Sequence, residues 1–163
     1  MKIILTCILG GAIALAPLPA GAAMSSAASV KGIHGEILST SQTKILDRKS
    51  ITVTGKDFDE TVGIYLGLCV IPKKGEAPTP CGGGINKQGV SQASHWISSN
   101  APPYGSGLAK PYLPGGRFTY SLTLSKMIGK VNCAKVRCAI TVRADHLRSS
   151  DRSYDLFIPV TFK

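Results

Sequence analysis

The stretch VNCAKVRCAITVRADH, from Val131 to His146, places two cysteines in front of a run in which apolar and polar residues alternate. Cys138, Ile140 and Val142 stand at alternate positions, which is the pattern of inward side chains on a half-buried β-strand. The strand would thus carry Cys138 on its buried face. The chemistry of this cysteine and of Cys133 therefore decides which fold the rest of the chain can adopt.

The beginning of the chain has the features of a secretory signal peptide. A single lysine precedes an apolar run from Ile3 to Ala16, and small residues at 20–23 form an A-x-A type cleavage site. The run is short for a membrane span, and two prolines follow it. We predict a signal peptide over residues 1–23, an exported domain over 24–163, and no integral membrane segment after signal removal.

Signal removal would take Cys7 away and leave four cysteines in the mature chain: Cys69, Cys81, Cys133 and Cys138. An even number of cysteines in an exported chain favours disulfides. Three pairings are formally possible. Local order favours Cys69 with Cys81 and Cys133 with Cys138, because each pair brackets one candidate turn. Bridges that close such short loops are worth about 2–3 kcal/mol each.

Zinc binding and thiol redox chemistry are the alternatives to disulfides. A structural zinc site needs four converging ligands and usually shows C-x2-C spacing. The cysteine spacings here are x11 and x4, and the histidines His34, His95 and His146 stand isolated. A redox pair would have C-x-x-C spacing in a βαβ pattern, which the sequence lacks. We therefore predict two disulfides, no metal site and no cofactor.

The basic charge of the chain bears on its partners. Nineteen Lys and Arg residues against nine Asp and Glu give a net charge of +10, of which the signal peptide carries one. Such an exported protein suits contact with anionic envelope polymers, phospholipid headgroups or nucleic acid. Because the basic residues are scattered in ones and twos, solubility alone explains them better than a dedicated polyanion site does. Nucleic acid is the least favoured of these partners.

The rest of the chain repeats the two-residue period of a β protein. Apolar residues alternate with polar ones in SITVT (50–54), in FTYSLTL (118–124) and in YDLFIPVTF (154–162). VGIYLGLCVI (62–71) is apolar at both sets of positions, as a central strand covered on two faces is. Weaker strand candidates precede residue 50, and no stretch shows a capped helical stripe. About seven short strands indicate an all-β sandwich.

A long segment from Pro72 to Gly116 interrupts this rhythm. It holds seven of the ten prolines, and loops of such length are usually functional or disordered. The rings of Trp96, Tyr104 and Tyr112 argue against disorder. We predict an ordered, irregular excursion over 72–116 that is tied down by Cys81 and contains at most one short strand, near residues 94–98.

Two motifs raise the question of catalysis or phosphate binding. In RADHLRSSDRSYD (143–155), Asp145 and His146 precede Ser149, yet there is no G-x-S-x-G elbow. Interleaved Arg and Asp more often fix a loop by hydrogen bonds, and an exposed recognition loop is the functional alternative. CGGG (81–84) is followed by neither Lys-Ser/Thr nor a helix, so a flexible turn is favoured over a phosphate cradle. The sequence therefore predicts no enzyme.

The segments on either side of the excursion resemble the neocarzinostatin family, small actinobacterial immunoglobulin-like sandwiches that include enediyne chromophore-binding apoproteins. VNCAKVRCAITVRADH and the later DLFIPVTF are similar to its pattern of two cysteines five apart, a strand, a loop and a last strand ending in Phe. ILDRKSITVTGKDF followed by VGIYLGLC is similar to an earlier family pattern, and Cys81 lies where the partner of the first bridge belongs. The resemblance covers roughly residues 45–81 and 117–163.

This resemblance implies a seven-stranded Greek-key sandwich with two local disulfides, and it implies a carrier function as one possibility. In the chromophore carriers the region between the matched segments helps to form the ligand cleft. Here that region is longer and rich in Gly, Pro and Ser, so no ligand contact carries over. The fold transfers more safely than the function.

We expect a secreted, monomeric, non-enzymatic binding module at the cell envelope. Its surface would combine residues 81–116 with the loop 143–155, and its partner would be a small aromatic ligand or an anionic envelope polymer. The alternative is a carrier that sequesters a small aromatic ligand, with DNA association as a further option. The expected ligand-binding residues are three ring anchors and two cations: Trp96, Tyr104, Tyr112, Arg148 and Arg152.

Overall fold

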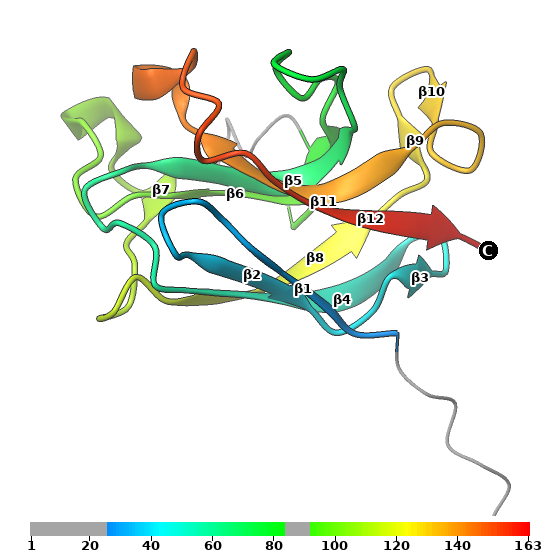
Figure 1. Ribbon diagram of the computed structural model, residues 1–163, viewed down its shortest axis with the longest axis horizontal. Helices are drawn as coiled ribbons and strands as arrows, with labels where there is room; N and C mark the ends of the chain where they lie inside the picture. Colours follow the sequence, from blue (N-terminus) through cyan, green and yellow to red (C-terminus); the bar gives the residue numbers. More distant parts are fainter. Residues whose placement is uncertain (1–25, 84–91) are drawn as a thin grey trace, which may run out of the picture.

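Two β-sheets lie face to face in the computed structural model, which describes residues 26–83 and 92–163 (Figure 1). The predicted signal peptide over residues 1–23 lies outside the described residues. Helical structure within the two described ranges is confined to short 3-10 turns. None of the described helices is long and apolar enough to cross a membrane. The prediction of an all-β sandwich is confirmed.

The smaller sheet has four antiparallel strands in the order β1-β2-β4-β8. Its strands are β1 (Ala28–Lys31), β2 (Ile37–Thr40), β4 (Lys49–Lys56) and β8 (Phe118–Leu124). The predicted alternation in β4 and β8 is confirmed, because Ile51, Val53 and Leu122 are buried between the sheets. Their polar neighbours in sequence point outward, away from the large sheet.

The larger sheet has the order β3-β12-β11-β5-β6-β7. Its strands are β3 (Lys44–Ile45), β5 (Ile64–Val70), β6 (Ser94–Ile97), β7 (Ala109–Lys110), β11 (Cys138–Ala144) and β12 (Leu156–Phe162). The pairs β3–β12 and β6–β7 are parallel and the others antiparallel. The chain crosses between the sheets from β4 to β5, from β7 to β8 and from β8 to β11, which is the Greek-key connectivity of an immunoglobulin-like sandwich.

Both predicted disulfides are present. Cys69 in β5 is bonded to Cys81, and Cys133 is bonded to Cys138 at the start of β11. The second bridge lies beside a small hairpin formed by β9 (Met127–Ile128) and β10 (Val131–Asn132). Cys138 is buried, as the alternation in the opening motif predicts.

Two short parts of the predicted excursion over residues 72–116 join the large sheet. The expected short strand is confirmed as β6 (Ser94–Ile97), which pairs with β5. The expectation of at most one strand is wrong, because β7 pairs with the free edge of β6 and adds a second strand. A 3-10 turn, η2 (Pro103–Gly105), lies between them. Residues 84–91 lie outside the described ranges. The excursion is thus anchored by strand pairing as well as by Cys81.

Candidate functional site

Strand register places a row of large polar side chains on the outward face of the large sheet. Tyr65 on β5 pairs with Trp96 on β6 and with Arg143 on β11. The next residues, Leu66 and Ile97, are buried on the opposite, inward face. Three adjacent strands therefore present Arg143, Tyr65 and Trp96 side by side.

The short turn η3 (His146–Arg148) brings a histidine over this row. Asp145 caps the turn, because one of its carboxylate oxygens accepts the backbone N–H of Leu147 at 3.0 Å. The other oxygen accepts the indole N–H of Trp96, also at 3.0 Å, in buried surroundings. Asp145 is only 1% exposed, so this carboxylate joins the turn to the sheet at the base of the site.

The imidazole of His146 lies between two tyrosine hydroxyls. Its Nδ1 is hydrogen-bonded to the hydroxyl of Tyr65, and its Nε2 lies 2.8 Å from the hydroxyl of Tyr104 in η2. The edge of the ring meets the indole of Trp96, with 5.0 Å between ring centroids. We call Tyr65, Trp96, Tyr104 and His146 the ring cluster. Tyr104 is 63% exposed, so the cluster presents its outer ring to solvent.

The ring cluster has no charge relay of the hydrolase type. Both nitrogens of His146 are used by phenols, and Asp145 is used by the indole and the turn backbone. Burial, followed by the nearby charge of Asp145, raises the pKa of Tyr65, so its hydroxyl stays protonated at neutral pH. Within residues 26–83 and 92–163, no group of three or more His, Cys, Asp or Glu could hold a metal ion. The arrangement fits recognition by hydrogen bonds and ring contacts.

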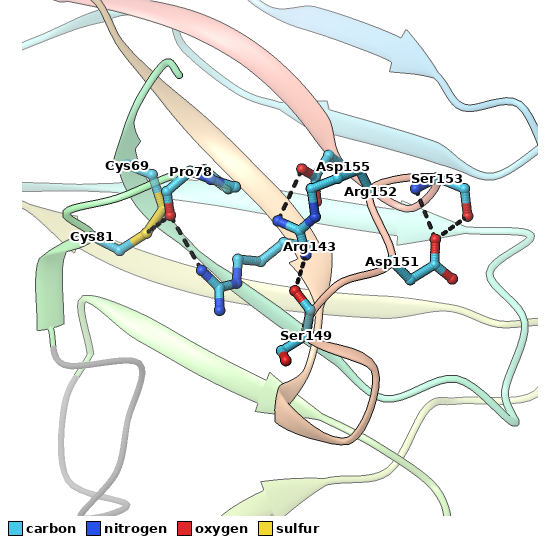
Figure 2. Close-up of polar contacts among 9 residues, drawn as sticks. All are labelled: Cys69, Pro78, Cys81, Arg143, Ser149, Asp151, Arg152, Ser153 and Asp155. Carbon is cyan, nitrogen blue, oxygen red and sulfur yellow. Dashed lines mark hydrogen bonds and ion pairs between the residues drawn. A yellow bond between two sulfur atoms is a disulfide. The ribbon is translucent and has the colours of Figure 1, made fainter. Parts of the chain in front are cut away.

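Figure 2 shows two arginines of this region, Arg143 on β11 and Arg152 in the loop that precedes β12. Arg143 donates from Nη1 to the carbonyl of Pro78 at 3.2 Å, and its guanidinium lies 6.0 Å from the centre of the Tyr65 ring. Arg152 donates from Nη2 to the carbonyl of Ser149 at 2.7 Å. The buried Nε atoms of both arginines have no hydrogen-bond partner among the described residues. Both guanidinium groups are therefore only partly satisfied by the protein.

Asp155 forms an ion pair with one of these arginines. Its Oδ2 lies 3.2 Å from Nη1 of Arg152, whereas its buried Oδ1 has no hydrogen-bond partner among the described residues. Burial raises the pKa of Asp155 to about 6, and the charge of Arg152 opposes that rise. The charges at the site are therefore mixed: Arg143 and Arg152 act on Asp155, and the carboxylates of Asp145 and Asp151 lie close enough to act on the same groups.

The Cys69–Cys81 disulfide lies next to Arg143 (Figure 2). A cavity of about 10 Å³ lies there, lined by Tyr65, Leu66, Gly67, Cys69, Cys81 and Arg143. Such a volume holds about one water molecule and no drug-sized ligand. The described surface is therefore nearly closed between the bridge and the ring cluster.

The structure brings together part of the predicted site. Trp96 and Tyr104 meet in the ring cluster, although Trp96 is only 4% exposed. Tyr112 lies instead in the core, where it packs against Phe58 and donates its hydroxyl to the carbonyl of Val62 at 3.0 Å. Burial raises the pKa of Tyr112. The predicted anchors therefore differ in their access to a ligand.

The two predicted cations also differ. Arg148 is exposed at the end of η3, whereas Arg152 is partly buried against Asp155. Sequence reasoning missed Tyr65, and it included Arg143 only as the first residue of the predicted loop 143–155; these two residues form the middle of the site. Both are polar side chains at outward positions of strands whose other residues are mostly apolar. A polar residue within such an apolar run was the sequence feature that could have identified them.

Comparison with known proteins supports the fold through a solved structure of low sequence identity. No family model matches the chain, and no curated protein sequence matches it. Among solved structures, macromomycin is similar with a TM-score of 0.51 and 14% sequence identity, over 79% of this chain and 100% of that chain. Macromomycin is a neocarzinostatin-family apoprotein. The chain therefore has a sandwich fold that is distantly similar to that of macromomycin.

Proposed function

We propose that the protein is an exported, monomeric, non-enzymatic binding module that acts at the cell envelope and recognises its partner with the outward face of the large sheet. The recognition surface consists of the ring cluster and the three neighbouring arginines, Arg143, Arg148 and Arg152. The two disulfides fit an oxidising compartment outside the cytoplasm. The predicted signal peptide supports the same location.

One observation carries this proposal. His146 is held between the hydroxyls of Tyr65 and Tyr104, which fixes the exposed ring of Tyr104 beside the arginines of the site. Rigid aromatic side chains supply contact area at low entropic cost, and arginine is enriched among the residues that dominate binding energy. The same bonds occupy both nitrogens that a general base would need. The geometry thus favours binding over catalysis.

The surface fits a partner with flat apolar groups and negative charges. Tyr104 offers an exposed ring face, and the guanidinium of Arg143 lies over Tyr65 in cation–π geometry. Arginine forks bind carboxylates and phosphates in a bidentate manner. An anionic envelope polymer or an aromatic anion has the matching chemistry.

Co-sedimentation with isolated cell envelopes of the producing organism tests the proposal. The double variant Tyr104→Ala with Arg148→Gln removes two exposed groups and leaves the buried Trp96–Asp145 contact in place. We expect its apparent affinity to fall about tenfold, which corresponds to about 1.4 kcal/mol. The matched control is Met127→Ala with Lys130→Gln, on the β9–β10 hairpin, which also loses one exposed apolar group and one charge.

The control variant should bind within about twofold of the wild-type protein, because its hairpin lies outside the proposed surface. Equal losses in the two variants would show that overall charge drives the association. Wild-type protein that stays in the supernatant would reject the envelope as the partner.

A carrier of a small aromatic ligand is the second candidate function, and the fold similarity to macromomycin favours it. The described cavity of about 10 Å³ would have to open for such a ligand to bind. Native mass spectrometry of the protein purified from its own host distinguishes the two candidates. The binding module predicts the mass of the mature chain with two disulfides, whereas a co-purifying small molecule would establish the carrier.

A further inference from the structure

The outward face of the small sheet is built from hydroxyl and cationic side chains. The strands β1, β2, β4 and β8 contain no Asp or Glu. The outward positions on the last two strands alternate with the buried core residues and are Ser50, Thr52, Thr54 and Lys56 on β4, and Thr119, Ser121 and Thr123 on β8. We call this surface the hydroxyl face. It lies on the opposite side of the molecule from η2 and η3 (Figure 1).

Strand register arranges the hydroxyls in a row across all four strands. Ser29 pairs with Ser39, Ser39 with Thr54, and Thr54 with Thr119. The hydroxyls of Ser29 and Ser39 are hydrogen-bonded to each other. Neighbouring strands lie about 4.8 Å apart, so the residues of the row repeat at this spacing across the sheet. This regularity matches a linear ligand that repeats its own hydrogen-bonding groups.

A second row, parallel to the first, carries the cations. Lys31 pairs with Ile37, and Ile37 pairs with Lys56. Arg117 immediately precedes β8 and lies beside Lys56 in the lining of a shared hollow. Outward residues two positions apart on a strand are separated by about 6.6 Å, which sets the spacing of the two rows.

The two rows meet at a hollow of about 290 Å³. Its lining is formed by Ile37, Ser39, Thr54, Gly55, Lys56, Leu113, Arg117, Phe118 and Thr119. The volume is close to that of the smallest ligand pockets, about 300 Å³. The lining of the hollow combines hydroxyl groups, the cations Lys56 and Arg117, and the apolar side chains of Ile37 and Leu113.

The protein compensates these cations only weakly. Nζ of Lys56 lies 4.0 Å from the carboxylate of Asp57, and both side chains are more than half exposed. Exposed pairs of this kind contribute little. Arg117 donates from Nε to the carbonyl of Pro114 at 2.8 Å, which orients its guanidinium without neutralising it. The positive charge of the hollow therefore remains available to an anion.

We propose that the hydroxyl face binds a linear, carboxylate-bearing polysaccharide. Sugar hydroxyls would exchange hydrogen bonds with the row from Ser29 to Thr119, and uronate carboxylates would meet Lys56 and Arg117. One sugar unit would occupy the hollow with its C–H face against Ile37. Charge complementarity selects an acidic polymer, and the hydroxyl row selects a sugar over a bare polyanion.

Binding of polygalacturonate, a soluble uronate polymer, tests the proposal in a titration with the disulfide-intact protein. Dextran, which is neutral, and polyphosphate, which lacks hydroxyls, are the comparison ligands. We expect polygalacturonate to bind about tenfold more tightly than either of them and to weaken as salt is raised. Polyphosphate that binds as tightly as polygalacturonate would overturn the proposal, and so would absence of polygalacturonate binding.

Two variants locate the binding to the hydroxyl face. Lys56→Gln with Arg117→Gln should weaken polygalacturonate binding about tenfold. The matched control, Lys73→Gln with Lys74→Gln, removes the same charge from exposed positions outside the small sheet and should have little effect. Equal losses in the two pairs would overturn the assignment.

Thr54→Val with Thr119→Val removes two hydroxyls and keeps β-branched residues in the strands. This variant should also bind polygalacturonate more weakly. Unchanged affinity would overturn the role of the hydroxyl row. This test does not depend on whether the variant Lys56→Gln with Arg117→Gln folds. The ring-cluster variant Tyr104→Ala with Arg148→Gln should bind polygalacturonate like the wild type. Loss of polygalacturonate binding in that variant would place the polymer on the other face and would contradict this inference alone.

Discussion

At the scale of single residues, the buried carboxylate of Asp145 organises the site. It accepts the indole N–H of Trp96 and the backbone N–H of Leu147, and it is almost fully buried. A buried carboxylate that loses a donor is costly, because neither water nor a second protein group replaces it. The position of His146, and with it the exposed ring surface, depends on this contact.

Replacing Trp96 by Phe removes the donor and keeps an aromatic ring at this buried position of the ring cluster. We expect the free energy of unfolding to fall by about 1–3 kcal/mol, since a charged acceptor is left unsatisfied. Tyr112→Phe is the control, because it removes a buried hydroxyl that bonds to a neutral carbonyl. Urea denaturation measures both variants. A loss in Trp96→Phe no larger than in Tyr112→Phe would show that Asp145 does not depend on the indole.

Asp155 gives the stability a specific pH dependence. Its ordinary pKa is 3.8, and burial raises the folded-state pKa to about 6. Between these values the folded protein holds a proton that the unfolded chain releases. The stability contributed by the protonated carboxyl is therefore complete below about pH 4 and is lost as the pH rises through about 6.

Asp155→Asn cannot ionise, so its free energy of unfolding relative to the wild type should rise between pH 4 and pH 7. Urea denaturation at a series of pH values measures this difference. The loss of the Arg152 partner shifts the whole curve of the variant, but it does not create a slope in this range, because arginine stays protonated. Parallel curves for the two proteins would contradict the raised pKa.

At the scale of elements, alternation and apolar runs predicted the long strands β4, β5, β8, β11 and β12, and local cysteine order predicted both bridges. β4, β8 and β12 follow the two-residue period, and β5 is apolar on both faces because the disulfide and the ring cluster cover its outward side. The sequence pattern predicted the β6–β7 edge less well, because a short strand gains its stability from the neighbouring strand with which it pairs. Contacts among Tyr65, His146 and Tyr104 join three distant segments and leave no periodic signal in the sequence.

The two bridges should differ in their effect on stability. Cys69 and Cys81 are 12 residues apart in sequence, whereas Cys133 and Cys138 are 5 apart. The larger loop restricts the unfolded chain more, so we expect Cys69→Ala with Cys81→Ala to cost about 3 kcal/mol and Cys133→Ala with Cys138→Ala about 2 kcal/mol. Guanidinium denaturation measures the two double variants. A clearly larger loss for the second pair would show that local packing outweighs loop entropy.

At the scale of the whole molecule, the sandwich separates two surfaces of different chemistry. The outward faces of the two sheets lie on opposite sides of the molecule (Figure 1). The outward face of the large sheet carries rings and arginines, while the outward face of the small sheet carries hydroxyls and cations. The basic composition was predicted to serve solubility, and its three-dimensional arrangement could not be read from cations scattered in ones and twos. Strand register collects Lys31, Lys56 and Arg117 on one face, and only the fold shows that.

Hydrogen exchange of the protein bound to isolated cell envelopes tests recognition through the ring cluster most directly. Amides in residues 102–110 and 145–155 should exchange more slowly in the bound protein, because η2 and η3 would lie under the partner. Amides of the β9–β10 hairpin should exchange at the same rate with and without envelopes. Unchanged exchange in both of the first two segments, measured on protein that has sedimented with the envelopes, would contradict the proposed recognition surface.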